Sequence, residues 1–304
     1  MGRCYTLDNK LVIPDTIEGL PVTELDTYTF SQTVRRREQP PAEYEGEPEM
    51  CGEALEKLTL PKHLEKVGAY AFYNCFHLKK LCCSTVRDWG AGVFTGCTQI
   101  NKLDIRIFPE EKSSFKEILS ELRQMLVVDY RDKEGKLLAK LIFPEFFEES
   151  IENTPARIIM REMHGCGHMY RYCFNGTDFQ FWEYDKLLPT AEILESPALV
   201  CRMALYRLYW PKGLTEEWKE EYWKYIKKHP DEAAKGLTER GEREILSWLA
   251  EAKETDSQML EQMIRATAGL GDAQVSAILM DARHKKMGAQ SGDKPKPRVR
   301  TFEL

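Results

Sequence analysis

Four residues within one ten-residue stretch have side chains that bind metal ions or act as nucleophiles: His164, Cys166, His168 and Cys173. Imidazole nitrogens and thiolates are the ligands that Zn²⁺ prefers, so zinc binding is one hypothesis for this stretch. Structural zinc sites usually pair their ligands on two separated knuckles, and this cluster has no second half. We therefore predict that the protein has no metal centre. The candidate ligands, should a metal bind, are these four residues.

Cys166 could instead be a catalytic thiol. A nearby imidazolium lowers the pKa of a thiol, and papain-like hydrolysis needs a Cys and a His that meet in space. Histidines this close in the sequence rarely reach the sulfur in the required direction, and no Asn or Gln partner stands at a recognisable position. The simpler interpretation is that Gly165 and Gly167 make a tight turn between helices. A metal- or thiol-dependent enzyme centred on Cys166 is the alternative function.

A second group of residues suits recognition of a polar partner. Arg157, Arg161 and Arg171 lie near Trp182 in a stretch rich in aromatic residues. Arg and Trp are frequent in binding sites, but they also hold helix bundles together by pairing and packing, which is the commoner role. These four residues are the candidates for partner binding, and the partner itself is not identified.

Motifs of the common enzyme classes are missing. The sequence contains no Gly-x-x-x-x-Gly-Lys-Ser/Thr phosphate loop, no Gly-x-Gly-x-x-Gly dinucleotide motif, no Gly-x-Ser-x-Gly elbow and no His-Glu-x-x-His zinc motif. The net charge is −6 and 30% of the residues are charged, so nothing in the composition suggests nucleic-acid binding. We therefore predict a protein that is not an enzyme and has no cofactor and no nucleic-acid partner.

The elements that would position these residues begin with a repeated pattern. Apolar residues at the first, fourth and sixth positions of 55–60 recur at 78–83 and at 100–105, after 23 and 22 residues. The Ala-Phe-x-x-Cys motif of 71–75 recurs as Val-Phe-x-x-Cys at 93–97. A period of this length indicates a solenoid, in which each unit makes one strand and one turn or short helix and stacks on the next.

These units resemble leucine-rich repeats of the bacterial surface-antigen type, or BspA-like repeats, which read as an apolar strand, a Pro, an apolar pair and then Ala-Phe-x-x-Cys. The resemblance implies a right-handed β-α superhelix. Residues 5–32 are predicted to be a divergent first repeat, because Val22, Leu25 and Phe30 recur at a constant offset of 42 residues. Residues 1–110 are thus predicted to be the solenoid, with an exposed, charged insertion at 33–54.

The remaining chain is predicted to be a cap and a helical domain. A helix over about 115–125, capped by Ser113 or Ser114, and a hairpin of 126–130 with 137–143 would make 111–144 the cap. Residues 145–287 are predicted to be all-helical, with helix caps at Thr215, at a capping box of Thr255 and Gln258, and at Asp272. Residues 288–304 are polar and are predicted to be a disordered tail.

The fold class predicted is therefore α+β, a short leucine-rich-repeat solenoid with a cap followed by an all-helical domain. The helical region resembles one that follows such repeats in proteins of gut Firmicutes without an assigned function. Together these features predict a non-enzymatic protein-interaction module or scaffold with an unidentified protein partner.

The compartment is predicted from what the chain lacks. No apolar run is long enough for a membrane span, and the first residues show no signal peptide. Nine scattered cysteines, an odd number, fit reduced thiols. If residue 1 is the native start, we expect a cytoplasmic protein, although the family that the repeats resemble also occurs on cell surfaces.

Overall fold

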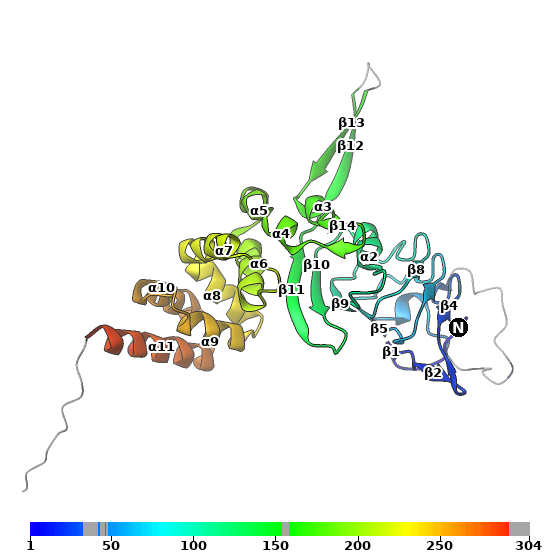
Figure 1. Ribbon diagram of the computed structural model, residues 1–304, viewed down its shortest axis with the longest axis horizontal. Helices are drawn as coiled ribbons and strands as arrows, with labels where there is room; N and C mark the ends of the chain where they lie inside the picture. Colours follow the sequence, from blue (N-terminus) through cyan, green and yellow to red (C-terminus); the bar gives the residue numbers. More distant parts are fainter. Residues whose placement is uncertain (33–41, 43–45, 47, 154–157, 292–304) are drawn as a thin grey trace, which may run out of the picture. The chain divides into compact units, whose positions relative to one another are not determined.

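The structure is a computed structural model that describes residues 1–32, 42, 46, 48–153 and 158–291 (Figure 1). The chain divides into two compact units. Unit one comprises Met1–Ser196 and Tyr206–Trp218, and unit two comprises Pro197–Leu205 and Lys219–Leu304. Each unit is described by itself below.

Unit one is built on a six-stranded sheet with the strand order β1-β5-β7-β9-β10-β11. Its parallel strands are β1 (Lys10–Val12), β5 (Lys57–Thr59), β7 (Lys80–Cys83), β9 (Lys102–Arg106) and β10 (Leu126–Arg131). The last strand, β11 (Leu137–Phe143), runs antiparallel to β10. The register places Leu11, Leu58, Leu81 and Leu103 in one buried row. This row confirms the predicted β-solenoid, which makes about three turns in residues 57–131.

The returning segments of the coils form a second, three-stranded sheet of β4 (Glu24–Leu25), β6 (Lys66–Val67) and β8 (Asp88–Trp89). Phe72 lies between Phe30 and Phe94, with ring centroids 5.5 and 5.6 Å away and nearly parallel rings. The Cys75 and Cys97 thiols donate to the carbonyl oxygens of the preceding coil, at 3.4 and 3.0 Å. The interior is therefore a stack of equivalent residues.

The first coil confirms the offset of 42 residues. Leu25 pairs with Val67, and β1 pairs directly with β5, so no repeat is missing between them. A short hairpin of β2 (Thr16–Ile17) and β3 (Leu20–Pro21) decorates this coil. Most of the predicted insertion, 33–41, 43–45 and 47, lies outside the described residues. Its described end includes the 3-10 helix η2 (Gly52–Ala54), whose Gly52 amide donates to the Phe30 carbonyl at 2.8 Å.

The predicted helix and hairpin after the repeats are present, with two differences. The helix α2 (Phe115–Glu121) ends earlier than predicted, because Leu122 is extended. Ser113 accepts from the Phe115 amide at 3.1 Å, whereas Ser114 donates to the Val86 carbonyl. Strand β10 also continues the parallel sheet beside β9 instead of only covering it. The segment from β9 through α2 to β10 is therefore one more turn of the solenoid.

The prediction that the chain is helical from residue 145 onward is wrong for residues 147–153 and 158–164. These residues form the antiparallel strands β12 (Phe147–Asn153) and β13 (Ile158–His164), which pair with no third strand in the described part of the chain. The Asn-Thr-Pro sequence before Ala156 is a turn signal, and a residue before Pro disfavours helix. A small hairpin of β14 (Phe174–Asn175) and β15 (Asp178–Phe179) follows.

Short helices complete unit one, namely α3 (Gly167–Tyr170), α4 (Phe181–Asp185) and α5 (Leu188–Leu194). Helix α6 (Pro197–Tyr209) contributes to both units. A buried ion pair lies within unit one, where Arg207 donates to both Asp185 carboxylate oxygens at 2.7 and 2.8 Å. Because buried charges persist only when they are paired, this contact ties the start of the Tyr206–Trp218 segment to α4.

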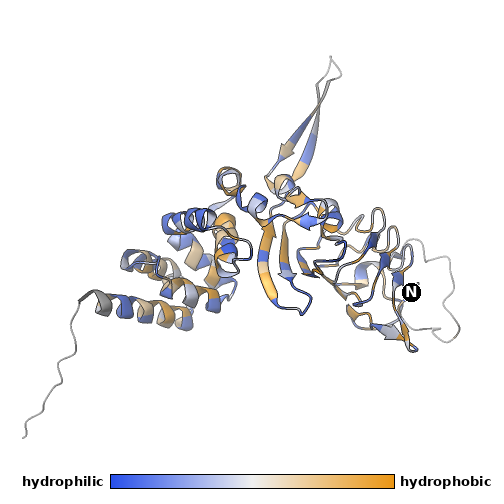
Figure 2. Cartoon of the chain, viewed as in Figure 1, coloured by the Kyte–Doolittle hydropathy of each residue, from blue (hydrophilic) through white to orange (hydrophobic). Residues whose placement is uncertain are grey.

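All the secondary-structure elements of unit two in its described residues are helices, as predicted. The helices after α6 are α7 (Glu216–Lys228), α8 (Pro230–Glu239), α9 (Arg243–Glu251), α10 (Ser257–Thr267) and α11 (Ala273–Ser291), with the 3-10 helix η3 (Ala268–Leu270) before α11. The predicted disordered tail is wrong for residues 288–291, which belong to the last helix, and residues 292–304 lie outside the described residues. Helix α8 packs on α9 and α10, and α11 packs on the same two helices. Figure 2 shows that these helices carry both hydrophilic and hydrophobic residues, as helices with one buried side do.

Two of the three predicted helix caps are confirmed. Thr215 accepts from the Trp218 amide at 3.4 Å, and Asp272 accepts from the Val275 amide at 3.2 Å. The predicted capping box at Thr255 is wrong, because Asp256 caps α10 by accepting from the Met259 amide at 2.8 Å. The Thr255 hydroxyl instead donates to the Leu249 carbonyl at the end of α9.

Replacing Phe72 by Ala tests the stacked core. The ring is fully buried between two others, so its loss leaves a cavity and is expected to lower the free energy of unfolding by about 3–5 kcal/mol. The matched control is Phe76→Ala in the same coil, since that ring is 40% exposed and its loss costs far less. Equilibrium urea unfolding of the full chain measures both, and equal losses would contradict the stacked core.

Candidate functional site

The structure does not gather the four candidate metal ligands into one site. His164 Nε2 lies 3.0 Å from the Glu149 carboxylate, and its ring stacks on Phe147. His168 Nδ1 lies 3.2 Å from the Gly165 carbonyl. The Cys173 thiol is buried and directed at the Met169 carbonyl. Across the residues that the structure describes, no group of three or more His, Cys, Asp or Glu side chains is arranged to hold a metal ion.

Cys166 lacks the environment of a reactive thiol. It is fully buried, and its Sγ donates to the Glu195 carboxylate at 3.1 Å. Burial, reinforced by the hydrogen bond and the negative charge of Glu195, raises the pKa of the Cys166 thiol well above its ordinary value. The thiol is therefore protonated at neutral pH, and the structure does not support the alternative of a thiol-dependent enzyme.

The glycines beside Cys166 form a turn, but one that leads from strand β13 into helix α3 instead of joining two helices. Gly165 has a φ of +80°, which favours glycine. At Gly167 a Cβ would lie 2.0 Å from the Pro144 carbonyl oxygen, so only glycine permits this approach. The glycines on either side of Cys166 are thus explained by the backbone geometry of this turn.

Arg171, a candidate for partner binding, is buried inside unit one. Its guanidinium donates at 2.7–2.8 Å to the carbonyl oxygens of Leu122, Pro144, Gly167 and Gln124. Burial lowers the pKa of Arg171 to about 10, so the side chain is still charged at neutral pH. Four of its five N–H groups bond to the chain itself, and this side chain ties the loops around α2 and α3 together.

The other three candidates for partner binding are scattered. Arg161 lies on β13 near Glu148, with 74% of its side chain exposed. Trp182, on α4, is 46% exposed and has the Lys186 ammonium 4.2 Å from its ring centroid. Arg157 lies outside the described residues. No hydrogen bond, ion pair or ring contact in the described structure joins Arg161, Arg171 or Trp182 to another of the three.

The outward face of the six-stranded sheet has a feature that the sequence analysis missed. Lys10, Lys57, Lys80 and Lys102 occupy one register position on four neighbouring strands, and we call them the lysine row. Adjacent strands lie about 4.8 Å apart, so each Lys stands beside the next. Of the four, only Lys80 has an ion-pair partner within the described chain, the Asp104 carboxylate at 3.8 Å. Comparing the residue that precedes the first leucine of each strand would have revealed the row.

Two residues further along the strands, Asp104 on β9 and Asp129 on β10 stand opposite each other on the same face, and cations pair with both. Arg131 Nε and Nη2 donate to the Asp104 carboxylate at 2.7 and 3.3 Å, and these bonds raise the pKa of Arg131. Asp129 lies between Arg131 and Lys140, at 3.8 and 3.6 Å. Every carboxylate on this face is thus already paired, and the surplus of charge is positive.

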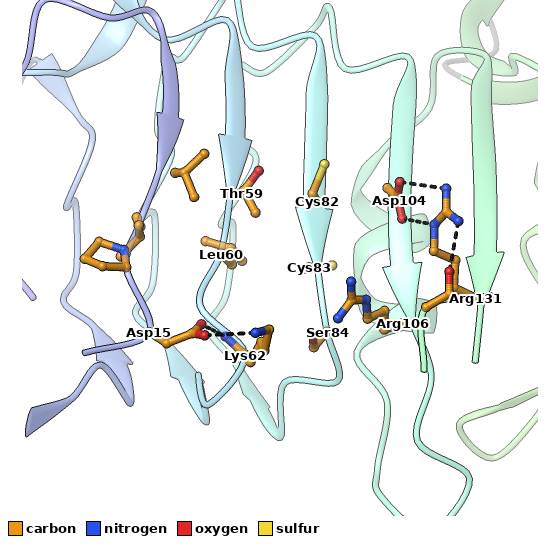
Figure 3. A pocket seen from close by; sticks show the side chains of 14 residues that line it. Asp15, Thr59, Leu60, Lys62, Cys82, Cys83, Ser84, Asp104, Arg106 and Arg131 are labelled. Carbon is orange, nitrogen blue, oxygen red and sulfur yellow. Dashed lines mark hydrogen bonds and ion pairs between the residues drawn. The ribbon is translucent and has the colours of Figure 1, made fainter. Parts of the chain in front are cut away.

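A groove of about 570 Å³ opens on this face at the ends of the strands (Figure 3). The residues that line it include Thr59, Lys62, Cys82, Ser84, Asp104 and Arg106. Figure 3 shows Asp104 joined to Arg131 and Asp15 joined to Lys62, while Arg106 lies beside Ser84. The groove is open and mixed in polarity, which suits an extended ligand better than an enclosed small molecule.

The comparisons with known proteins concern this same sheet. A family model described as "BspA type Leucine rich repeat region (6 copies)" matches residues 49–122. Residues 49–122 are a BspA-type leucine-rich repeat region. No curated protein and no solved structure matches the chain.

The BspA-type repeat region includes three strands of the lysine row and the central strands of the groove. A leucine-rich repeat region suggests a protein-interaction module, which agrees with an open, charged sheet face. Each helix in the described part of the chain is too short or too polar to span a membrane.

Pulsed alkylation tests the inert state of Cys166. At neutral pH the native thiol is expected to react at least about a hundredfold more slowly than in the denatured chain, because it is buried and protonated. Peptide mass spectrometry after a short iodoacetamide pulse measures the modification of each cysteine. A native Cys166 that reacts as fast as the denatured thiol would contradict this result and support the hypothesis of a catalytic thiol.

Arg171→Lys and Arg161→Lys form a matched pair that separates a structural arginine from an exposed one. Lys cannot reach the four carbonyl groups that Arg171 serves, so this substitution is expected to cost at least about 3 kcal/mol of stability. Arg161→Lys, on the exposed hairpin, is expected to stay within about 0.5 kcal/mol of wild type. Urea unfolding checks both, and a neutral Arg171→Lys would contradict the structural role.

Proposed function

We propose that the protein is an interaction module whose leucine-rich repeat region binds an acidic segment of a partner protein. The outward face of the six-stranded sheet is the binding surface, and the lysine row is its main contact. The observation that carries this proposal is the register of Lys10, Lys57, Lys80 and Lys102, of which only Lys80 pairs with a carboxylate in the described structure.

Like charges placed directly across neighbouring strands destabilise a sheet. This repulsion between neighbouring lysines is not required by the fold, because Glu or Thr at any one of these outward positions would relieve it. The outward positions of β1, β5, β7, β9 and β10 instead carry six cations and two carboxylates. An acidic segment laid across the strands would neutralise the row and gain electrostatic attraction, so the arrangement favours binding over stability.

The charge of this face is local. The whole chain has a net charge of −6, so an excess of acidic residues lies elsewhere. Screening in physiological salt limits the influence of exposed charges to about 8 Å, which exceeds the distance between neighbouring lysines of about 4.8 Å. A ligand that approaches the sheet therefore meets a positive surface, although the protein as a whole is acidic.

Charge reversal in the lysine row tests the proposal. The probe is a fluorescein-labelled peptide of alternating Glu and Ser, whose binding to the full chain is followed by fluorescence anisotropy. Lys57→Glu combined with Lys102→Glu is expected to weaken binding at least about tenfold, and added salt is expected to weaken the wild-type complex.

The matched control is Lys227→Glu with Lys228→Glu on α7, two exposed lysines in unit two whose reversal changes the net charge by the same amount. This control is expected to bind the peptide like wild type. An equal loss in both double variants would mean that only net charge matters. A wild-type chain that does not bind the peptide would refute the proposal outright.

A further inference from the structure

We infer that Arg106 is the anchor of this surface and binds a side-chain carboxylate of the acidic segment in the groove. The inference rests on the proposed function and names the group that sets where the segment lies. It starts from the register of the sheet, in which Arg106 on β9 stands directly opposite Arg131 on β10. Two like charges face each other across a ladder, an arrangement that is unfavourable without a counter-ion.

The counter-ion in the structure serves only one of the two arginines. Asp104 accepts two hydrogen bonds from Arg131, and a third N–H of Arg131 donates to the Gly135 carbonyl at 3.1 Å. The guanidinium of Arg106 has no hydrogen bond or ion pair with any residue that the structure describes, and Figure 3 draws none. Arg106 is half-buried, so it has given up part of its hydration without a partner in return.

The residues around Arg106 bond to its backbone and limit the space beside its guanidinium. Its carbonyl oxygen accepts from the Thr85 hydroxyl at 3.4 Å. The turn between β10 and β11 packs against the guanidinium at Gly135, where φ is +90° and a Cβ would lie 3.3 Å from Arg106 Nη2. Ser84 lines the same groove, and its hydroxyl makes no hydrogen bond to a described residue. The Arg106 guanidinium and the Ser84 hydroxyl therefore offer hydrogen-bond donors to one oxyanion in the groove.

A carboxylate fits this position better than a phosphate. A guanidinium binds a planar carboxylate through two parallel hydrogen bonds, which adds direction to the attraction. The two carboxylates of the groove are each paired with a cation, Asp15 with Lys62 and Asp104 with Arg131, so among the described residues the lining keeps one unpaired positive charge, that of Arg106, which a singly charged carboxylate neutralises. The ligand chemistry that the groove selects is thus the side chain of a Glu or Asp.

The position of Arg106 also sets the spacing of the ligand. Arg106 and Lys102 are outward residues of the same strand, four residues and therefore about 13 Å apart. An extended peptide covers that distance in about four residues. A segment with one carboxylate on Arg106 therefore reaches the lysine row with an acidic residue about four positions away.

Two substitutions of Arg106 test the anchor with the same alternating Glu and Ser peptide. Arg106→Gln removes the charge, and Arg106→Lys keeps the charge but loses the two-pronged geometry. Both are expected to weaken binding at least about tenfold, because the bidentate contact is what anchors the segment. The control is Arg87→Gln, an exposed arginine of the same repeat region outside the groove, which is expected to bind like wild type. Thermal melting of each variant confirms that it is folded.

The outcomes separate this inference from the proposed function. If the reversed lysine row loses the peptide while Arg106→Gln binds like Arg87→Gln, the anchor is wrong and the proposed function stands. If Arg106→Lys binds like wild type, only charge matters and the anchor is again wrong. A matching peptide with phosphoserine in place of Glu is expected to bind more weakly, and tighter binding that depends on Arg106 would overturn the carboxylate assignment. A wild-type chain that binds neither peptide refutes both.

Discussion

The stacking of successive coils in one register determines both the inside and the outside of the sheet. Leu58 lies between Leu11 and Leu81, and all three are buried, so each coil completes the core of its neighbours. Because successive side chains of a strand point to opposite faces, a slip by one residue would expose the leucines and bury the lysines. Burying an unpaired lysine is far more costly than exposing it. The lysine row therefore also helps to specify the register that produces it.

The same constraint explains how the solenoid ends. A parallel sheet leaves an open edge after β9, and the chain covers it with a further parallel strand, β10, and the antiparallel β11. The crossover through α2 then creates carbonyl groups in loops that no strand can satisfy. Arg171 bonds to several of these carbonyls, including those of Leu122 and Gln124, which are more than forty residues away along the chain. Arg171, a candidate recognition residue in the sequence, thus stabilises the loops at the end of the solenoid.

The repeats could be predicted from the sequence because their spacing reports directly on strand position, even in the divergent first coil. The hairpin of β12 and β13 was missed because a two-stranded ribbon of short strands leaves only a short local signal, and its side chains at 147–150 and 160–163 are exposed. The environment of Cys166 could not be predicted either, since its partner Glu195 is 29 residues away and no pattern links the two. The lysine row was missed for a different reason. Each Lys is an ordinary surface residue, and the four align only when the residue before the first leucine of each strand is compared across the repeats.

Arg106 shows most clearly how the proposed function of this sheet depends on strand pairing. In the sequence, β10 belongs to a cap, and nothing predicts that Arg131 will face Arg106. Because β10 pairs in parallel with β9, Arg131 lies close enough to Asp104 to donate hydrogen bonds to its carboxylate. Arg106 lines the groove and has no counter-ion in the described structure. The added turn of the solenoid thus closes the core and, at the same time, leaves Arg106 available for the carboxylate that we propose as its partner. The groove and the lysine row then lie on one continuous face, because the register that stacks the leucines also aligns the outward residues of every strand.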